Sequence, residues 1–448
     1  MELKKNDVVE ARIDGAASGG EGVAHIDGRA VFVKGALPGE VCRAHILRAG
    51  KGVVWAKAEE IIEHSEHRIV PECPYFPRCG GCALLHADYA GELEIKLARV
   101  NDALERIGGL ELRAERVEPS PERFGYRNKA VFAVGRAGGR AVTGFYRARS
   151  HDILPVESCL LQTPAANAAA RALRGWMDET GAPEYDEKTS RGCVRRLMTR
   201  TASDGSTAVC VVCAREPRGL GSLVESFRRE VPGLVSVVLD KNASRGNVVL
   251  SGDERVLWGD ERLTDTLLGL RFSLSPTSFF QINRRQTERL YSKAIEYCGL
   301  EGSGLLLDLY CGTGTIGLCA ARNCGRVVGA EVVPSAVSDA RDNARRNGIE
   351  NAEFILADAA EAAKRLADAG ERPDVVIVDP PRAGLSPAVI AEIVRMAPRR
   401  VVYVSCDPAT LARDLRIFAP DYEAVEASCF DMFPCTSHVE CVTLMTRR

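Results

Sequence analysis

The sequence of 448 residues contains no run of about 18 apolar residues, the length that a membrane-spanning helix needs. Its first residues lack the apolar segment and the cleavage site of a secretory signal, so we expect a cytoplasmic protein. Charge is nearly balanced at a formal net charge of −2, and the charge of the whole chain therefore does not indicate a nucleic-acid partner. The length predicts two or three domains.

Cysteine is abundant, with 16 residues, and without a secretion signal metal binding or catalysis is favoured over disulfides. Cys73, Cys79 and Cys82 form a C-x5-C-x2-C pattern in a loop rich in Gly and Pro. Three thiols this close indicate a zinc or iron–sulfur site, and both remain open from the residues themselves. The pattern differs from the C-x3-C-x2-C of radical enzymes. Other cysteines in apolar surroundings are expected to pack in the core: Cys210, Cys213, Cys298, Cys319, Cys324 and Cys441.

Basic residues are concentrated locally. Residues 113–149 contain nine Arg or Lys against three Glu, with Phe and Tyr interleaved among them. This mixture suits phosphate contact and base stacking in an RNA-binding surface. A solvated strand face with aromatic residues in the core explains the same pattern, so both interpretations stand.

The N-terminal residues 1–60 alternate short apolar runs with glycine, which predicts a small β-barrel. The pattern resembles the TRAM domain, an OB-like RNA-binding module; an SH3-like accessory barrel is the alternative. Residues 61–275 are expected to form a central α+β domain. Within them, 91–108 has the spacing of an amphipathic helix, with an apolar stripe made of Leu93, Leu97, Val100, Leu104 and Ile107. The helix must dock on another part of the chain, and the catalytic domain is one candidate.

From residue 276 to 448 the pattern changes to alternating strands and helices. Apolar strands are expected at 305–307, 327–330, 375–378 and 401–404. Such βαβ alternation predicts a parallel, doubly wound, Rossmann-like sheet. The expected architecture is therefore a multidomain α/β protein.

A glycine-rich loop follows the first of these strands. Gly312 and Gly314 belong to a G-x-G-x-x-G pattern, and Glu331 ends the next strand, where an acidic residue reaches ribose hydroxyls. A nicotinamide dehydrogenase and a methyltransferase share this pattern. Asp308, at the end of the first strand, would repel a pyrophosphate but suits the cationic groups of S-adenosylmethionine. We therefore expect S-adenosylmethionine, with Asp358 as an adenine contact.

A possible nucleophile and base follow near the C-terminus. Cys406 lies 27 residues after Asp379, which opens an Asp-Pro-Pro-Arg segment, and 34 residues before Glu440. A thiolate that adds to C6 of a pyrimidine makes C5 nucleophilic. A carboxylate such as Glu440 can then remove the C5 proton. These parts predict methylation of C5 of uracil.

These segments together resemble the RNA uracil-5-methyltransferases, most closely the bacterial 23S rRNA members that carry a TRAM domain and an iron–sulfur cluster. The resemblance covers nearly the whole chain. It implies that Cys406 is the nucleophile and Glu440 the base. RNA cytosine-5-methyltransferases carry a second cysteine in their Pro-rich loop, and Asp-Pro-Pro-Arg has none, which favours uracil. The residues matching the family's methyl-donor contacts are Gln281, Tyr310, Glu331 and Asp379.

The resemblance further implies a [4Fe-4S] cluster held by Cys73, Cys79, Cys82 and Cys159, which anchors the basic segment and supports RNA binding. We expect 23S rRNA as substrate and a monomer that needs no protein partner. The same chemistry on tRNA is the nearest alternative. A nicotinamide oxidoreductase and an RNA-binding protein with an idle catalytic domain are alternatives of other classes.

Overall fold

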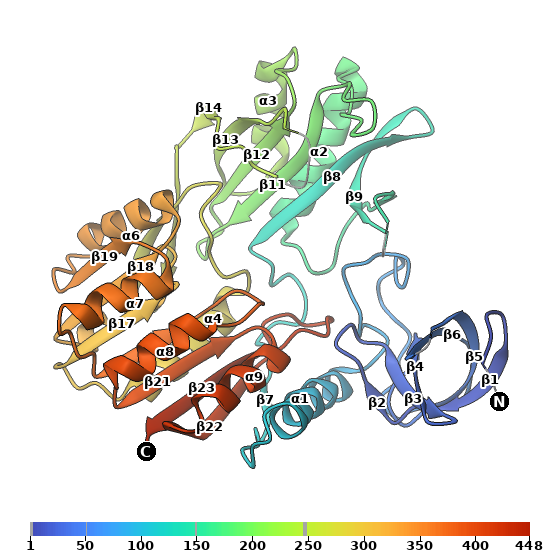
Figure 1. Cartoon of the computed structure of the whole chain (residues 1–448). Coiled ribbons are helices and arrows are strands. Elements are labelled where there is room, and N and C mark those ends of the chain that lie inside the picture. The colour runs from blue at the N-terminus through green and yellow to red at the C-terminus, as the bar shows by residue number, and fades with distance from the viewer. Residues whose placement is uncertain (1–2, 51, 148–149, 245–248) are drawn as a thin grey trace. The chain divides into compact units, whose positions relative to one another are not determined.

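The computed structural model describes residues 3–50, 52–147, 150–244 and 249–448, and Arg149 of the basic segment lies outside them. The chain divides into two compact units. Figure 1 labels their helices and strands. Unit 1 comprises Met1–Ser120, Pro381–Gly384 and Ser405–Met445. Unit 2 comprises Pro121–Pro380, Leu385–Val404 and Thr446–Arg448. The expected domain boundaries at residues 60 and 275 stay predictions.

Unit 1 begins with a small β-sheet barrel. Its strands run in the order β1-β5-β6-β4-β3-β2. Alternate apolar side chains, among them Ala24, Val31, Val33 and Ile46, fill its interior. The sequence predicts a small barrel here from its short apolar runs separated by glycine, and the alternation is the period of two of its strands. The strands are β1 (Val8–Arg12), β2 (Gly15–Ala16), β3 (Gly22–Ile26), β4 (Arg29–Lys34), β5 (Val41–Ala49) and β6 (Val53–Glu63).

The rest of unit 1 combines a long helix with C-terminal elements. Helix α1 (Tyr89–Arg106) begins at the N-cap Asp88 and packs against α9 (Pro408–Phe418). Strand β22 (Tyr422–Phe430) lies between β23 (Glu440–Arg447) and the short β7 (Val117–Glu118).

The predicted apolar stripe of α1 is partly wrong. Ile107 is the C-cap and is 41% exposed, whereas Glu92 and Lys96 are completely buried. The buried face of α1 therefore differs from the predicted apolar stripe and includes the charged residues Glu92 and Lys96. It could not be predicted from apolar spacing, because the charges are buried only through partners far away in the sequence.

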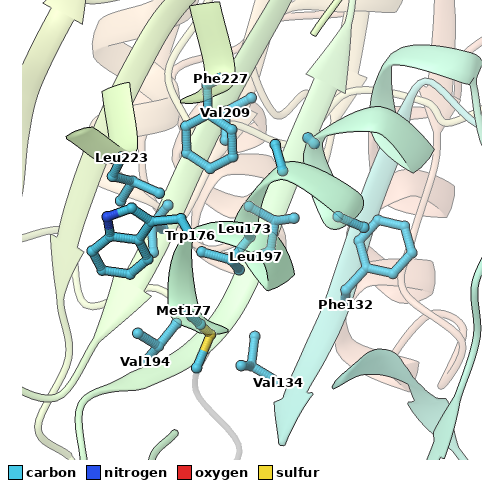
Figure 2. Close-up of a cluster of buried hydrophobic side chains, with 14 of the residues drawn as sticks. Phe132, Val134, Leu173, Trp176, Met177, Val194, Leu197, Val209, Leu223 and Phe227 are labelled. Carbon is cyan, nitrogen blue, oxygen red and sulfur yellow. The ribbon is translucent and has the colours of Figure 1, made fainter. Parts of the chain in front are cut away.

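Unit 2 contains a central sheet of strand order β10-β9-β8-β11-β12-β13-β14. Helices α2 (Pro164–Thr180) and α3 (Leu220–Glu230) cover one face, where Trp176 packs with Leu223 and Phe227 (Figure 2). The α+β expectation for this region agrees with these elements. The strands are β8 (Lys129–Ala137), β9 (Arg140–Tyr146), β10 (Ile153–Pro155), β11 (Val194–Thr201), β12 (Thr207–Cys213), β13 (Leu234–Lys241) and β14 (Glu254–Gly259).

The second part of unit 2 is an open parallel sheet in the order β19-β18-β17-β20-β21. Ligand sites in such sheets lie at the carboxyl ends of the strands. Before it come the hairpin β15 (Leu263–Leu267) and β16 (Leu270–Leu274), and helix α4 (Arg284–Cys298). The sheet comprises β17 (Leu305–Leu309), β18 (Arg326–Glu331), β19 (Ala352–Leu356), β20 (Val375–Val378) and β21 (Arg400–Ser405). The helices between these strands are α5 (Thr315–Ala320), the 3-10 helix η1 (Ala321–Asn323), α6 (Pro334–Arg346), α7 (Ala359–Asp368) and α8 (Pro387–Met396).

Candidate active site

The glycine-rich loop joins β17 to α5 in unit 2, and its backbone has the left-handed conformation at Tyr310, Gly312 and Gly314. A Cβ atom on Gly314 would lie 2.9 Å from the ring of Phe354, so this position excludes any side chain. A Cβ on Gly312 would meet nothing within 4 Å. The loop is thus packed on one side and open on the other.

Glu331, at the end of β18, is tied to this loop. Its carboxylate accepts hydrogen bonds from the backbone N–H of Gly312 at 3.0 Å and from those of Val332 and Val333 at 2.9 Å each. Three backbone donors hold the carboxylate in one orientation. Val332 stays 62% exposed beside it, as an apolar surface next to a fixed acidic group.

Two carboxyl groups in this unit have strongly raised pKa values. Asp308 is fully buried; its Oδ2 accepts from the N–H of Gly317 at 2.9 Å, while Oδ1 has no hydrogen-bond partner among the described residues. Burial raises the pKa of Asp308 to about 8, with the nearby charges of Asp379 and Glu331 adding to the effect. Burial also raises the pKa of Asp379, at the end of β20, to about 7. A cluster of acids with an unused oxygen suits a cationic ligand. Direct contact between Asp308 and a ligand stays a prediction.

The other two predicted cofactor residues lie in the same unit. Gln281 belongs to the loop before α4, and its backbone carbonyl accepts from Nδ2 of Asn128 at 2.8 Å. The buried Arg200 donates to the carbonyl of Ser278 in the same loop at 2.7 Å. The central sheet therefore holds the loop that carries Gln281, which sequence reasoning did not anticipate. Asp358 is exposed and caps α7 through the N–H of Glu361.

In unit 1, Cys406 is half-buried and directly precedes the N-terminus of α9. Asp407 is the N-cap and accepts from the N–H groups of Ala409 and Thr410, and Pro408 begins the helix. Asp and Pro are the residues typical of the N-cap and the first helical position, which explains why α9 starts here. The positive end of a helix dipole favours a thiolate.

Glu440 is also in unit 1, at the start of β23, and it is 5% exposed. Two residues earlier, Nε2 of His438 accepts a hydrogen bond from Nη2 of Arg382 at 3.3 Å. Arg382 closes the Asp-Pro-Pro-Arg segment, and His438 opens the His-Val-Glu segment that ends in Glu440; the sequence predicts no contact between them. Their pairing shows that the Pro-Pro-Arg segment and the His-Val-Glu segment meet within this unit.

Arg99 of α1 is a residue that sequence reasoning missed. It donates to the backbone carbonyl of Ser437. Burial lowers the pKa of Arg99, and the charge of Arg382 adds to this effect, while the charge of Asp407 acts in the opposite direction. A half-buried cation therefore lies in the electrostatic field of Asp407, the residue next to Cys406. Nothing local in the sequence around Arg99 indicates this role.

The predicted metal ligands are divided between the units. Cys73, Cys79 and Cys82 are half-buried in unit 1, and Cys159 is half-buried in unit 2. The backbone of Cys159 is fixed by Asn167 of α2, whose side chain bonds its N–H at 2.9 Å and its carbonyl at 3.1 Å. Within the described parts of the chain, no three potential ligands are gathered closely enough to hold a metal ion.

The sheet is open and parallel, and its glycine-rich loop is bonded to an acidic residue on the neighbouring strand. This arrangement is typical of Rossmann-like enzymes that bind a nucleotide-containing cofactor. Residues 258–448 match the family model described as tRNA (Uracil-5-)-methyltransferase, and residues 2–58 match the TRAM domain. The N-terminal barrel is thus a TRAM domain. No helix in the described part of the chain is long and apolar enough for a membrane span.

Whole-chain comparisons agree with these matches. The chain is 42% identical to an uncharacterized RNA methyltransferase of Caldanaerobacter subterraneus subsp. tengcongensis, over 99% of each chain. It is 39% identical to one of Clostridium acetobutylicum, over 99% of this chain and 98% of the other. The tRNA (uracil-54, C5)-methyltransferase of Pyrococcus abyssi, solved with S-adenosyl-L-homocysteine, superposes with a TM-score of 0.79 at 28% identity, over 98% of this chain and 100% of that one. The chain therefore belongs to the RNA (uracil-5-)-methyltransferase family of enzymes, as its motifs predict.

Proposed function

We propose that this protein transfers the methyl group of S-adenosylmethionine to C5 of a uridine in RNA through a covalent adduct at Cys406. The observation that carries the proposal is the position of Cys406 directly before the N-terminus of α9, in the same unit as the buried Glu440. A thiol at that end of a helix is favoured as the thiolate nucleophile.

The proposed reaction has three steps. The thiolate of Cys406 forms a bond to C6 of the uracil, and the electron pair moves to C5. C5 then takes the methyl group, and S-adenosylhomocysteine leaves with the electron pair of the broken S–C bond. Glu440 removes the proton from C5. The electron pair of the broken C5–H bond then restores the C5–C6 double bond, and the thiolate of Cys406 is expelled.

The cofactor residues proposed for this reaction are those of the sheet in unit 2. The open side of Gly312 leaves room for a ligand, and the orphaned oxygen of Asp308 fits a cationic one. S-adenosylmethionine carries such charges on its sulfonium and ammonium groups. Glu331, held by three backbone N–H groups, is proposed to bind ribose hydroxyls. The residues proposed to bind the methyl donor are Gln281, Asp308, Tyr310, Gly312, Gly314, Glu331, Asp358 and Asp379.

We propose 23S rRNA as the substrate, since the chain resembles the rRNA members with a TRAM domain and a cysteine loop. The observation that supports the tRNA alternative is the similarity to the tRNA (uracil-54, C5)-methyltransferase of Pyrococcus abyssi. Incubation with S-adenosylmethionine labelled in its methyl group, with 23S rRNA and tRNA offered separately, distinguishes the two.

A [4Fe-4S] cluster held by Cys73, Cys79, Cys82 and Cys159 is part of the proposal. Four half-buried thiols fit the ligand chemistry of such a cluster. Asn167 would keep the backbone of Cys159 in place. When bound, the cluster would supply a covalent anchor for the loop before α1.

RNA containing 5-fluorouridine tests the covalent step. Fluorine at C5 replaces the proton that Glu440 must remove, so the adduct should persist in denaturant. The expected result is a protein–RNA complex whose crosslinked peptide contains Cys406. The Cys406→Ala variant should form none, while Cys42→Ala, which changes a buried cysteine of the barrel, should form it normally. A complex formed by Cys406→Ala would refute the proposal.

A further inference from the structure

The segment before Glu440 is held by a buried ionic cluster that the proposed chemistry does not use. Nζ of Lys96 lies 2.7 Å from Oε1 of Glu92 and 2.6 Å from Oδ1 of Asp431, and all three side chains are fully buried. It also donates to the carbonyl of Phe433 at 3.2 Å. Lys96 therefore uses all three of its N–H donors, which an ammonium group out of water requires.

Further contacts from α1 reach the same segment. The hydroxyl of Tyr89 donates to Oδ2 of Asp431 at 2.9 Å, and Oε1 of Glu92 accepts from the N–H of Cys435 at 2.6 Å. Arg99 donates to the carbonyl of Ser437. The helix residues in these contacts are three or four positions apart and share one face. We call residues 431–437 the α1-bound loop.

Residues of α1 form hydrogen bonds with every second residue of the α1-bound loop. The bonded positions are Asp431, Phe433, Cys435 and Ser437, and His438 follows directly. Such a spacing fixes the whole backbone from the end of β22 to within three residues of Glu440. Little freedom remains in the position where β23 begins.

Cys435 shows that the loop is held against an unfavourable conformation. Its φ is 69°, in the left-handed region that residues other than glycine seldom adopt. Its N–H bonds Glu92, and its carbonyl accepts from the N–H groups of Ala83 and Leu84 at 3.0 and 3.1 Å. Strain of this kind persists where the surroundings over-determine it, and it is concentrated at functional sites.

Stability does not explain why charges are used here. Two carboxylates and one ammonium are buried where apolar side chains could pack, and apolar replacements of buried ion pairs are often neutral or stabilising. What the ionic cluster provides is a fixed geometry, since each bond specifies a direction and a distance.

We infer that Glu92 and Lys96 are positioning residues for the proposed base. They set the α1-bound loop and, through it, the carboxylate of Glu440. This inference rests on the proposed function, because it takes Glu440 as the group that removes the C5 proton.

The test compares Lys96→Met with Glu440→Gln in the full-length protein. Lys96→Met keeps the apolar stem and removes the charge. We expect kcat to fall by about tenfold to a hundredfold, as a slightly misplaced catalytic group implies, with the KM for RNA little changed. The slowed step should be elimination, so a denaturant-stable complex with ordinary, unfluorinated RNA should accumulate, as in Glu440→Gln.

The matched control is the ion pair of Asp102 and Arg106 on the same helix, whose side chains are 59% and 76% exposed. Arg106→Gln should leave kcat and the adduct level unchanged. If Lys96→Met lowers the thermal stability but eliminates at the normal rate, the residue is only structural and the inference is overturned. If Glu440→Gln turns over normally, the proposed base is wrong, which is a different failure.

A second variant covers a failure of Lys96→Met to fold, which S-adenosylhomocysteine binding and thermal unfolding would reveal. Tyr89→Phe keeps the ring and removes the hydrogen bond to Asp431. It should accumulate the same complex to a smaller extent, with kcat reduced by about threefold to tenfold, the value of one hydrogen bond. Normal elimination by a folded Tyr89→Phe variant would overturn the inference.

Discussion

Nη2 of Arg382 lies 3.3 Å from Nε2 of His438, which connects the Pro-Pro-Arg segment to the segment that ends in Glu440. The ring nitrogen can accept this bond only when it carries no proton. The pairing therefore adds a second restraint on the residues just before Glu440, next to the α1-bound loop.

Replacing Arg382 by Gln should slow methylation about fivefold, because one hydrogen bond contributes about 1 kcal/mol. Binding of S-adenosylhomocysteine should be unchanged. Initial rates with saturating RNA would measure the effect. Arg416→Gln, at an exposed position of α9, is the matched control and should methylate at the wild-type rate. Equal rates for both variants would remove Arg382 from the proposed site.

Glu440→Gln should separate methyl transfer from elimination. The amide cannot take the C5 proton, so addition and methyl transfer proceed while expulsion of the thiolate stalls. A denaturing gel should show a methylated protein–RNA complex that the wild-type enzyme does not accumulate. Ordinary turnover without this complex would exclude Glu440 as the base.

The raised pKa values of Asp308 and Asp379 predict that cofactor binding depends on pH. At pH 7 the carboxyl of Asp308 in the free protein is largely protonated and that of Asp379 is about half protonated, since their pKa values are about 8 and about 7. A cationic ligand favours their ionised forms, so binding releases protons and tightens as the pH rises from 6 to 8, by at most about tenfold per pH unit for each proton released. Calorimetry in two buffers of different ionisation enthalpy would count the protons.

The same groups act on stability with a definite sign. Because their folded pKa values lie above those of the unfolded chain, their contribution favours folding at low pH and is lost as the pH rises from about 4 through 8. Asp308→Asn should therefore flatten the decline in the free energy of unfolding over this range and release fewer protons on binding. An unchanged profile would contradict the raised pKa of Asp308.

Protein purified without oxygen should be brown and contain about four iron atoms per chain, as a cubane held by four thiolates requires. Cys79→Ser or Cys159→Ser should bleach it and weaken RNA binding, while binding of S-adenosylhomocysteine survives. Asn167→Ala, which frees the backbone of Cys159, should retain less iron than a surface control such as Arg171→Ala on the same helix. Colourless protein that contains zinc would refute the iron–sulfur proposal.

The sequence predicts those parts of the structure that depend on local patterns. The strands before Tyr310 and Cys406 and the small barrel all follow from residue periodicity and turn signals. The buried charges of α1 could not be predicted, because Lys96 is stabilised by Asp431, which lies 335 residues away in the chain. The contact between Asn128 and the loop of Gln281 could not be predicted for the same reason, because the two residues are 153 positions apart. Long-range polar partners leave no periodic signal.

Gly312 and Gly314 of the cofactor loop are a matched pair of positions for substitution by alanine. Both have a positive φ, 55° for Gly312 and 78° for Gly314, so alanine at either position should cost about 1–2 kcal/mol of unfolding free energy through backbone strain. At Gly314 the new methyl group would also lie 2.9 Å from the ring of the buried Phe354, and this clash adds a further cost.

Gly314→Ala should therefore be the less stable variant, and it should lose cofactor binding because the loop must shift. At Gly312 the methyl group enters open space, so Gly312→Ala should keep most of its stability. If that space receives S-adenosylmethionine, Gly312→Ala should nevertheless bind S-adenosylhomocysteine more weakly. Urea denaturation and calorimetry of the two variants would measure both quantities. Undiminished binding by a well-folded Gly312→Ala would place the ligand elsewhere.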